Sequence, residues 1–546
     1  AQVGLLTPRK SMARLQDRTR RWSHARPEHA DRQWAEDGPQ KRGRGHGARL
    51  ARQYGRQGRS DRWQHDDVAA ESFAEVRASV INGDADMGNV AVTIRSFAGE
   101  VLLGPIEKPR STPAESLKQY LRNARPGNGV RLLHGTRELM DHETLAVASP
   151  AADGALDLSA VMTKTYSVVA WGEETYGGRV CSGAETGILK LFSSSGAFAV
   201  IKEGGAVSAW GHPAYGGDVG AASRQLTSGV VSICAGKNAF VALKDDGSAV
   251  PWGNARFGGK PRGIVAKQLA RGIASVESSG EAFAALTVTG AVVTWGVDGF
   301  GGDSSAVSEE LASGVVTLCK TNSAFAALKE QGGVVTWGHV QNGGNSLVVA
   351  GQLSSGVTRI FSNATAFAAL TQGGRVVVWG NPSCGGSAGG VMEQLASDVT
   401  TIYNSGSAFA AVKADGEVIT WGQAGEPTIA AEHLARGGAA VQSNGFAVAL
   451  ALEGGAVETR GDGRSGGDSS KVAKELASGV TALFSTAGAF AALKEGGSVV
   501  TWGRGQPTNH GGDSSTVADA LACGIVAIRN TQSAFAALKD IRKQPA

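Results

Sequence analysis

Apolar side chains occupy both faces of two short segments near the C-terminal end of the chain, residues 489–494 and 499–503. Phe490 and Ala492 point to one side of an extended backbone, and their apolar neighbours point to the other. Strands that are apolar on both faces are typical of sheets covered on both sides. The glycine-rich turn at 495–497 joins the two segments and predicts an antiparallel hairpin.

This hairpin recurs along the C-terminal two thirds of the chain, and in each complete copy a Trp-Gly pair follows the Phe after twelve residues. One copy is eroded and carries Val448 and Arg460 at these two positions. Successive Trp residues, with Arg460 counted at the Trp position of the eroded copy, lie 39 to 43 residues apart. A period of this length is typical of a solenoid or a propeller. We expect these aromatic residues to pack between modules; they are Trp171, Phe198, Trp210, Phe240, Trp252, Phe283, Trp295, Phe325, Trp337, Phe367, Trp379, Phe409, Trp421, Phe490, Trp502 and Phe535.

A third strand is predicted in each copy by a Gly-Val pair followed by Leu or Ile, as at 314–318. The connector that precedes it is exemplified by 467–476, where Asp468 or Ser469 can cap one helical turn; a short edge strand is the alternative. Three strands and a connector use about 42 residues, the size of one propeller blade. The pattern thus predicts a mainly β protein with a propeller of about nine modules over residues 166–539, and a short C-terminal tail at 540–546.

The two ends of the array complement each other. Residues 167–171 form a Trp strand without a Phe partner, and residues 534–538 form a Phe strand without a Trp partner. Together they make one blade, so we expect a closed or nearly closed ring. An open spiral, or pairing of the first strand with residues 158–163, would leave the ends apart.

The repeats resemble those of the regulator of chromosome condensation (RCC1) family. The resemblance rests on the succession Gly-Val-x-x-Ile, Ala-x-x-Ala-Leu and Gly-x-Val-x-x-Trp-Gly across residues 166–539. It implies a β-propeller and allows guanine-nucleotide exchange on a small GTPase. The connectors differ from that family, since the best copies read Gly-Gly-Asp-Ser-Ser, as at 301–305.

A small α+β domain is predicted before the repeats, over residues 88–163. Strands are indicated at 90–95, 100–106, 130–134 and 155–162, and a helix begins near Ser111. Residues 112–121, 131–139, Asp141 and 144–145 make this region resemble the ubiquitin-like β-grasp domain. The resemblance implies a link to ubiquitin-pathway components, with Leu133 on the partner surface. Alternation of Leu132 and Leu133 between core and surface is the purely structural reading.

Residues 1–86 are predicted to be a disordered, Arg/Gly-rich tail. Residues 1–65 contain 16 Lys/Arg and 6 Asp/Glu, a net charge of +10, whereas the whole chain has only +4. Such a segment buries little apolar surface and favours disorder. Binding to chromatin or RNA through its cations is the alternative.

No catalytic motif stands out in the sequence. The five cysteines lack the spacing of a disulfide framework or a zinc site. Asp303, Asp468 and Asp513 recur after two glycines, where a turn or a helix cap is favoured over a calcium site. No run of 18 apolar residues is present, so no membrane span is expected.

We therefore expect a non-enzymatic interaction scaffold without a cofactor, in the cytoplasm or nucleus. Its propeller faces would bind a protein partner, and its N-terminal domain would connect it to the ubiquitin pathway. Nucleotide exchange on a small GTPase, and nucleic-acid association through residues 1–65, are the alternatives.

Overall fold

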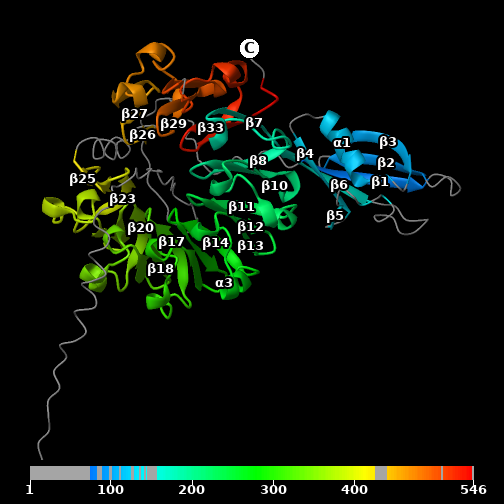
Figure 1. Ribbon diagram of the computed structural model, residues 1–546. Coiled ribbons are helices and arrows are strands. Elements are labelled where there is room, and N and C mark those ends of the chain that lie inside the picture. Colours follow the sequence, from blue (N-terminus) through cyan, green and yellow to red (C-terminus); the bar gives the residue numbers. More distant parts are fainter. Residues whose placement is uncertain are drawn as a thin grey trace, which may run out of the picture.

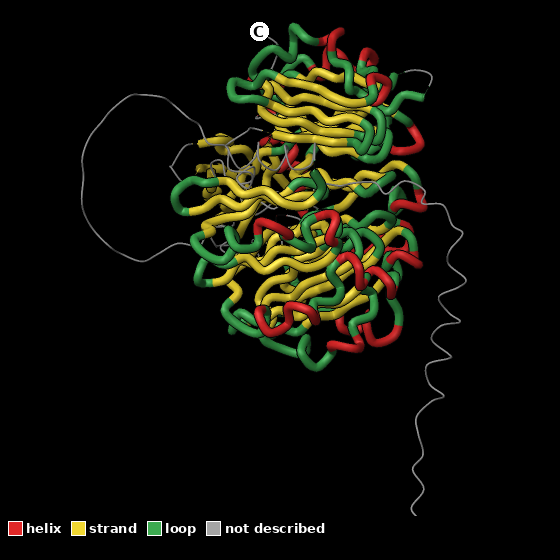
Figure 2. The backbone as a smooth tube through the Cα atoms, turned by 90° about the vertical axis from the view of Figure 1, so that its left-hand side faces the viewer, coloured by secondary structure: helices red, strands yellow, loops and turns green. Residues whose placement is uncertain are grey.

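The computed structural model has two parts rich in β-sheet, an N-terminal α+β sheet and a ring of small sheets that follows it (Figure 1). The strands of the ring form separate ladders, and short helical turns lie in the connections between them (Figure 2). Residues 1–73 of the predicted tail and residues 544–546 lie outside the described part of the chain. The structure describes residues 74–82, 89–96, 101–109, 112–124, 128–134, 137–139, 143, 145, 157–424, 440–505 and 508–543.

The N-terminal sheet has the strand order β3-β2-β1-β6-β4-β5 and carries one helix. Leu117 and Leu121 of the helix are buried in a core shared with Leu132 and Leu158 of the sheet. The elements are β1 (Ala74–Asn82), β2 (Asn89–Ser96), β3 (Val101–Pro109), α1 (Ala114–Ala124), β4 (Asn128–His134), β5 (Arg137–Leu139) and β6 (Asp157–Lys164).

Strand β1 corrects the predicted boundary of the tail. Residues 74–82 were expected to be disordered, yet they form a strand antiparallel to both β2 and β6. A strand in the middle of a sheet pairs its backbone groups on both edges, so these residues belong to the domain. The predicted order ββαββ becomes βββαβββ, with β1 and β5 added. The ubiquitin-like character of this domain remains a prediction.

The ring contains nine three-stranded antiparallel sheets in the described residues, and each is one blade. Blade 1 is β8–β10, the later blades follow in chain order, and blade 9 consists of β32, β33 and β7. The inner strands are β8 (Ile188–Ser193), β11 (Val230–Ala235), β14 (Ile273–Ser278), β17 (Val315–Lys320), β20 (Val357–Ser362), β23 (Val399–Asn404), β26 (Ala440–Ser443), β29 (Val480–Ser485) and β32 (Ile525–Asn530).

The middle strands carry the Phe and the outer strands carry the Trp of each repeat. The middle strands are β9 (Ala197–Lys202), β12 (Ala239–Lys244), β15 (Ala282–Thr287), β18 (Ala324–Lys329), β21 (Ala366–Thr371), β24 (Ala408–Lys413), β27 (Ala447–Ala451), β30 (Ala489–Lys494) and β33 (Ala534–Lys539). The outer strands are β10 (Val207–Gly211), β13 (Ala249–Gly253), β16 (Val292–Gly296), β19 (Val334–Gly338), β22 (Val376–Gly380), β25 (Val418–Gly422), β28 (Val457–Gly461), β31 (Val499–Gly503) and β7 (Ser167–Gly172).

Short helical turns form the connectors and two of the hairpins. In the connector to blade 8, a 3-10 turn begins after its N-cap residue Ser469, whose side chain makes no capping hydrogen bond, and Asp468 accepts the backbone N–H of Ser470 at 2.9 Å. The predicted helical turn is therefore present, and the edge-strand alternative is wrong there. The α-helical turns are α3 (Gly263–Gln268) and α5 (Ala518–Leu521). The 3-10 turns are η1 (Glu174–Tyr176), η2 (Glu203–Gly205), η3 (Pro213–Tyr215), η4 (Gly220–Gln225), η5 (Ala255–Phe257), η6 (Asp298–Phe300), η7 (Ser305–Val307), η8 (Val340–Asn342), η9 (Leu347–Gln352), η10 (Pro382–Cys384), η11 (Gly389–Val391), η12 (Gly463–Ser465), η13 (Ser470–Val472), η14 (Glu495–Gly497) and η15 (Ser515–Val517).

The two ends of the array meet in blade 9, as the repeat pattern predicts. Strand β33 pairs with β7, and Phe535 lies opposite Trp171 in the ladder. Their rings stack with centroids 5.3 Å apart, as they do in the complete blades. Residues 158–163 belong to β6 of the N-terminal sheet, so the alternative pairing is wrong. The ends of the array are therefore held together by a full strand ladder.

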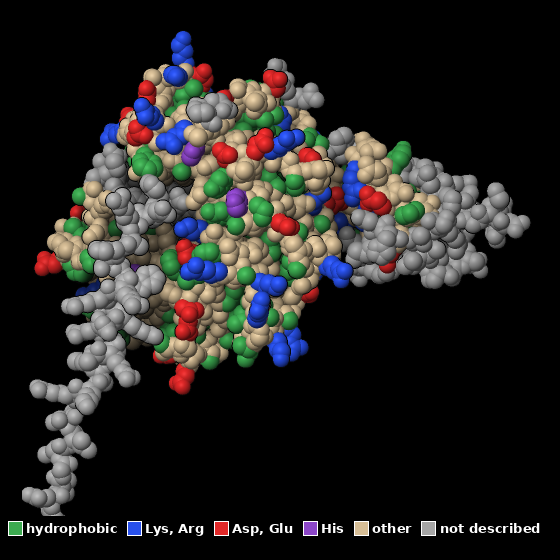
Figure 3. Space-filling model, viewed as in Figure 1, with side chains coloured by type: hydrophobic (Ala, Val, Ile, Leu, Met, Phe, Trp, Pro, Cys, Tyr) green, Lys and Arg blue, Asp and Glu red, His purple; other side chains and the backbone are tan. Residues whose placement is uncertain are grey.

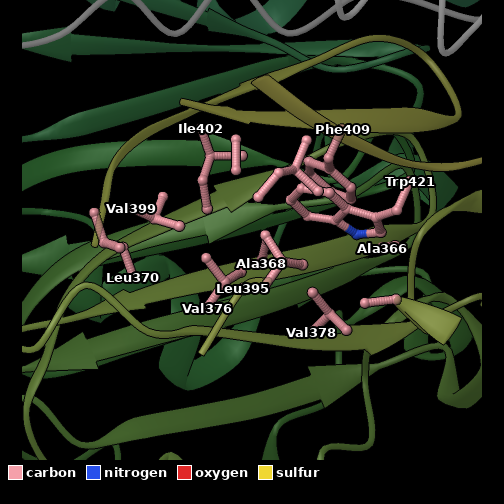
Figure 4. Packing of buried hydrophobic residues seen from close by; sticks show 13 residues of the cluster. Ala366, Ala368, Leu370, Val376, Val378, Leu395, Val399, Ile402, Phe409 and Trp421 are labelled. Carbon is pink, nitrogen blue, oxygen red and sulfur yellow. The ribbon is translucent and has the colours of Figure 1, made fainter. Parts of the chain in front are cut away.

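Each complete blade packs its aromatic pair against the blade before it. Phe409 and Trp421 of blade 6 lie in one apolar cluster with Ala366, Ala368 and Leu370 of blade 5 (Figure 4). The pair stacks at 5.3 Å, and the alanines leave room for the two rings. Corresponding clusters fill the other junctions in the described residues, except the one between blades 6 and 7.

Each connector that leads into a complete blade contains two successive glycines, and the first of them completes this contact. The indole Nε1–H of Trp421 donates to the carbonyl oxygen of Gly385 at 3.1 Å. Gly385 has a φ of +95°, and a Cβ there would lie 2.7 Å from Cδ2 of Phe409. Only glycine combines this backbone conformation with so close an approach of the aromatic ring.

Blade 7 lacks the aromatic pair. Val448 and Arg460 stand where the other blades have Phe and Trp, and they lie opposite each other in the ladder. The Arg460 guanidinium lies 3.6 Å from Glu458, and both side chains are half exposed. The face of blade 7 that corresponds to the aromatic faces of the other blades is thus partly charged.

Glu203, in the hairpin of blade 1, joins the ring to the N-terminal domain. Arg122 Nη2 lies 3.2 Å from Glu203 Oε1, and the backbone N–H of Val130 donates to the same oxygen. A Cβ at Gly129 would lie 2.7 Å from Cδ of Glu203, so the glycine makes room for this carboxylate. Burial raises the pKa of the Glu203 carboxyl, while the hydrogen bond and charge of Arg122 oppose that rise. The N-terminal domain is therefore anchored at the hairpin end of the blade.

Replacing Phe535 by Ala tests the joining of the ends. Because Phe535 is fully buried between blades, we expect Phe535→Ala to lower the free energy of unfolding by about 3–5 kcal/mol, as for any large core aromatic. Phe409→Ala, inside the array, is the matched control and should cost about the same. Urea denaturation followed by far-UV circular dichroism measures both. A much smaller loss for Phe535→Ala than for Phe409→Ala would show that the ends are not joined.

Alanine at Gly466 tests the glycine contact. Its Cβ would lie 2.5 Å from Cδ2 of Phe490 at a φ of +94°, so we expect a loss of about 1–3 kcal/mol from strain. Gly463→Ala, three residues earlier, meets no heavy atom closer than 3.4 Å and should change stability by less than about 0.5 kcal/mol. Thermal melts of the two variants provide the comparison, and equal melting temperatures would contradict the proposed role of Gly466.

Candidate functional site

A cavity of about 280 Å³ lies on the ring axis, at the end of the inner strands where the chain turns into the middle strands. Every blade contributes to its lining, so the cavity exists only in the assembled ring. Its walls are Ser193, Ala235, Ser278, Ser279, Gly280, Lys320, Thr321, Asn322, Asn363, Ala364, Asn404, Ser405, Gly406, Gln442, Phe484, Ser485, Ile528, Arg529 and Asn530.

The turns around the cavity are held by side chains that recur at one repeat position. Thr321 Oγ1 accepts the backbone N–H of Ala324 at 3.0 Å and donates to the carbonyl of Asn342 at 3.0 Å. Asn363 makes the same kind of bridge in the next blade and donates to the carbonyl of Cys384 at 2.6 Å. Among the described residues, such hydroxyl and amide groups anchor seven of the nine turns to the following connector, and much of their hydrogen-bonding capacity is therefore structural.

Backbone hydrogen bonds link the turns of neighbouring blades around the cavity. The N–H of Asn322 donates to the carbonyl of Ala364 at 2.9 Å, and the N–H of Ala364 donates to Gly406 at 3.2 Å. On the other side of the ring, the N–H of Gln532 donates to the carbonyl of Ser195 at 2.8 Å. Among the described residues, links of this kind join blades 8, 9, 1, 2 and 3 into one arc and blades 4, 5 and 6 into another, so we expect the rim of the cavity to be rigid within each arc.

Among the described residues that line the cavity, only Lys320 and Arg529 are charged. Lys320 ends the inner strand of blade 4, and Arg529 lies near the end of the inner strand of blade 9. In a ring of nine blades these two are separated by five junctions in one direction and four in the other. The two cations therefore come from opposite sides of the axis.

Groups suited to acid–base or metal chemistry do not gather at this cavity. The described residues contain no group of three His, Cys, Asp or Glu side chains placed to hold a metal ion. Burial raises the pKa of the Cys234 thiol, which disfavours the reactive thiolate. The pKa of Asp303 is lowered because its carboxylate accepts the backbone N–H of Ser305, a turn contact. The cavity is thus equipped for binding through charge and hydrogen bonds.

The outer surface offers no comparable feature in the view of Figure 3. Basic and acidic side chains are interspersed over the ring there, without a broad patch of one kind among the coloured residues. No helix in the described residues is long and apolar enough to cross a membrane.

The predicted partner residue Leu133 lies on β4 of the N-terminal domain, away from the axial cavity. Leu132 is fully buried, whereas Leu133 is half-buried and lies opposite Glu138 and Ser159 in the sheet. The alternation of core and surface is therefore present, and the role of Leu133 in binding stays a prediction. The recurring Phe and Trp residues stack in pairs with centroids 5.0 to 5.4 Å apart and lie inside the ring wall.

Sequence reasoning missed Lys320 and Arg529. The signal that could have revealed them is their departure from the repeat. Corresponding inner strands end in Ser, Ala or Asn where blade 4 has Lys320, and none of them has a cation where blade 9 has Arg529.

No protein-family model matches this sequence, and no curated protein matches it. Solved structures similar to the chain include human WBSCR16, with 17% identity over 48% of this chain and 91% of that one, and a TM-score of 0.29. Prp20p from Saccharomyces cerevisiae, described with its binding properties to Gsp1p and histones, has 14% identity over 68% of this chain and 91% of its own, with a TM-score of 0.31.

The CRINKLY WD40 ectodomain of an Arabidopsis thaliana receptor kinase has 15% identity over 50% of this chain and 93% of its own, with a TM-score of 0.26. Prp20 is also called yeast RCC1, so RCC1 proteins are among the structures to which this chain is similar. Similarity at these identities concerns the fold alone. The propeller architecture is established by the nine sheets and the pairing of the chain's first and last repeat strands.

Proposed function

We propose that the protein is a non-enzymatic interaction scaffold that binds a protein partner on the face of the ring around the axial cavity. This surface, the axial face, consists of the cavity lining and the turns 194–196, 236–238, 279–281, 321–323, 363–365, 405–407, 444–446, 486–488 and 531–533. The observation that carries the proposal is the cross-linked rim of polar turns around a cavity to which all blades contribute. A rigid, preorganised surface loses little conformational entropy when a partner binds.

The position of the N-terminal domain supports this choice of face. Its anchor, Glu203, follows β9, whereas the axial turn 194–196 precedes that strand. Six residues of extended chain separate the two ends by roughly 20 Å. The domain is thus attached at the other end of the blade, where its own surface, including Leu133, would be available to a ubiquitin-pathway component.

Guanine-nucleotide exchange on a small GTPase is the second candidate, and it rests on the resemblance of the repeats to the RCC1 family. The same axial turns would provide the contact surface. Association with chromatin or RNA would involve residues 1–65, which lie outside the described part of the chain, and it stays a prediction.

A matched pair of substitutions at the two ends of β18 tests the choice of face. Asn322→Glu introduces a charge beside the cavity, and Gln331→Glu introduces the same charge in the exposed hairpin. We expect Asn322→Glu to reduce recovery of the partner about tenfold or more, because a rigid surface cannot repack around a misplaced charge. Gln331→Glu should leave recovery unchanged.

Proximity labelling and pull-down with the full chain and both variants provide the measurement. Loss of the partner with Gln331→Glu but not with Asn322→Glu would place the contact on the hairpin end and contradict the proposal. A captured GTPase whose nucleotide release is accelerated by the wild-type chain, but not by Asn322→Glu, would favour the exchange candidate.

A further inference from the structure

We infer that the axial cavity is a receptor for an oxyanion, a carboxylate or phosphate group that is inserted along the ring axis. The inference rests on the proposed function, because it names the chemistry of the group that a partner would present to the axial face. It is carried by the charges of the lining, their positions across the axis and the size of the cavity.

The charged residues in the described part of the lining are both positive. Lys320 and Arg529 are its charged members, and the other walls are neutral hydroxyl, amide, apolar and glycine residues. Since none of the described lining residues carries a carboxylate, an anion inside the cavity meets two cations and no negative charge on these walls. A cavity that carries one sign of charge between low-dielectric walls concentrates ions of the opposite sign.

The two cations are placed for one ligand between them. Lys320 comes from blade 4 and Arg529 from blade 9, on opposite sides of the axis. Lys320 makes no ion pair or hydrogen bond with the described residues, so its three ammonium protons can be donated to a ligand. Arg529 donates from Nη1 to the carbonyl of Ile528 at 3.3 Å, which ties its planar guanidinium, suited to carboxylate and phosphate, to the strand.

One acidic residue lies close to this region. Glu277 precedes the lining residue Ser278, and both Glu277 and Lys320 act on the Cys234 thiol through their charges. Glu277 is not part of the cavity lining, however. We therefore expect it to weaken the field of Lys320 without filling the cavity.

The size of the cavity sets the kind of ligand. Its volume of about 280 Å³ is at the lower limit of small-molecule sites, which begin at roughly 300 Å³. One anionic group and a short stem fit such a space, whereas a helix or a strand does not. The group belongs either to a free small anion or to an acidic side chain or chain end of a protein partner, and the experiment separates these two sources.

Isothermal titration calorimetry of the full chain tests the inference, with inorganic phosphate in one arm and a capped, Glu-rich peptide in the other. We expect binding of at least one probe, a 1:1 stoichiometry and weaker binding at higher ionic strength. Lys320→Met and Arg529→Gln should each reduce affinity about tenfold or more, as the loss of a charge-assisted hydrogen bond does. Lys320→Arg, which keeps the charge, should retain binding.

Lys267→Met is the matched control, since this lysine lies on α3, away from the cavity lining, and the variant should bind like the wild type. Binding of phosphate alone identifies a free small anion as the ligand, and binding of the peptide, with phosphate as competitor, identifies a protein segment. Absence of binding by both probes, or unchanged affinity in the double variant Lys320→Met/Arg529→Gln with an unaltered circular dichroism spectrum, would overturn the inference. Recovery of the protein partner by the Asn322→Glu variant is measured in the absence of phosphate and peptide. The scaffold proposal is therefore tested independently of the anion site.

Discussion

The contact between the aromatic pair of one blade and the glycine of the preceding connector holds the ring together. In every blade that has the pair, the Trp indole N–H donates to a glycine carbonyl in the preceding connector at 2.9 to 3.1 Å. A buried indole N–H without an acceptor would be costly, so the Trp, the stacked Phe and the glycine depend on one another. The alanines of the middle strand serve the same contact, because larger side chains would keep the next blade's rings away.

Blade 7 shows what happens when the contact is lost. Val448 and Arg460 replace the Phe and the Trp together, and Glu458 pairs with Arg460 on the same face. The joint replacement is understandable, because the Phe and the Trp stack on each other, and the loss of one removes part of the packing of the other. The apolar clusters of the described residues continue across the junction from blade 7 to blade 8, but none spans that from blade 6 to blade 7. The chain ends, in contrast, are held by a complete ladder.

The strand ladders could be predicted from the sequence because their cause is local. Alternation around Phe490 and a turn at 495–497 specify a hairpin within fifteen residues, and the unmatched strands at Trp171 and Phe535 predict their own pairing. Strand β1 has a local signal too, since apolar and polar residues alternate over 74–80 and β2 follows it directly. What the sequence does not reveal is its second pairing, with β6, far along the chain. The cavity was hidden for the same reason, because Lys320 and Arg529 are more than 200 residues apart in the sequence.

Repetition also limits where function can reside in such a ring. The recurring Phe, Trp and glycine residues are committed to packing between blades, and hydroxyl and amide side chains such as Thr321 and Asn363 are committed to holding the turns. Specific recognition of a ligand therefore has to come from positions at which one blade differs from the others. Lys320 and Arg529 are such departures, and they occur where all blades converge on one cavity. A ring of near-identical blades thus acquires a specific site through two individual side chains, while the remaining blades supply its neutral walls.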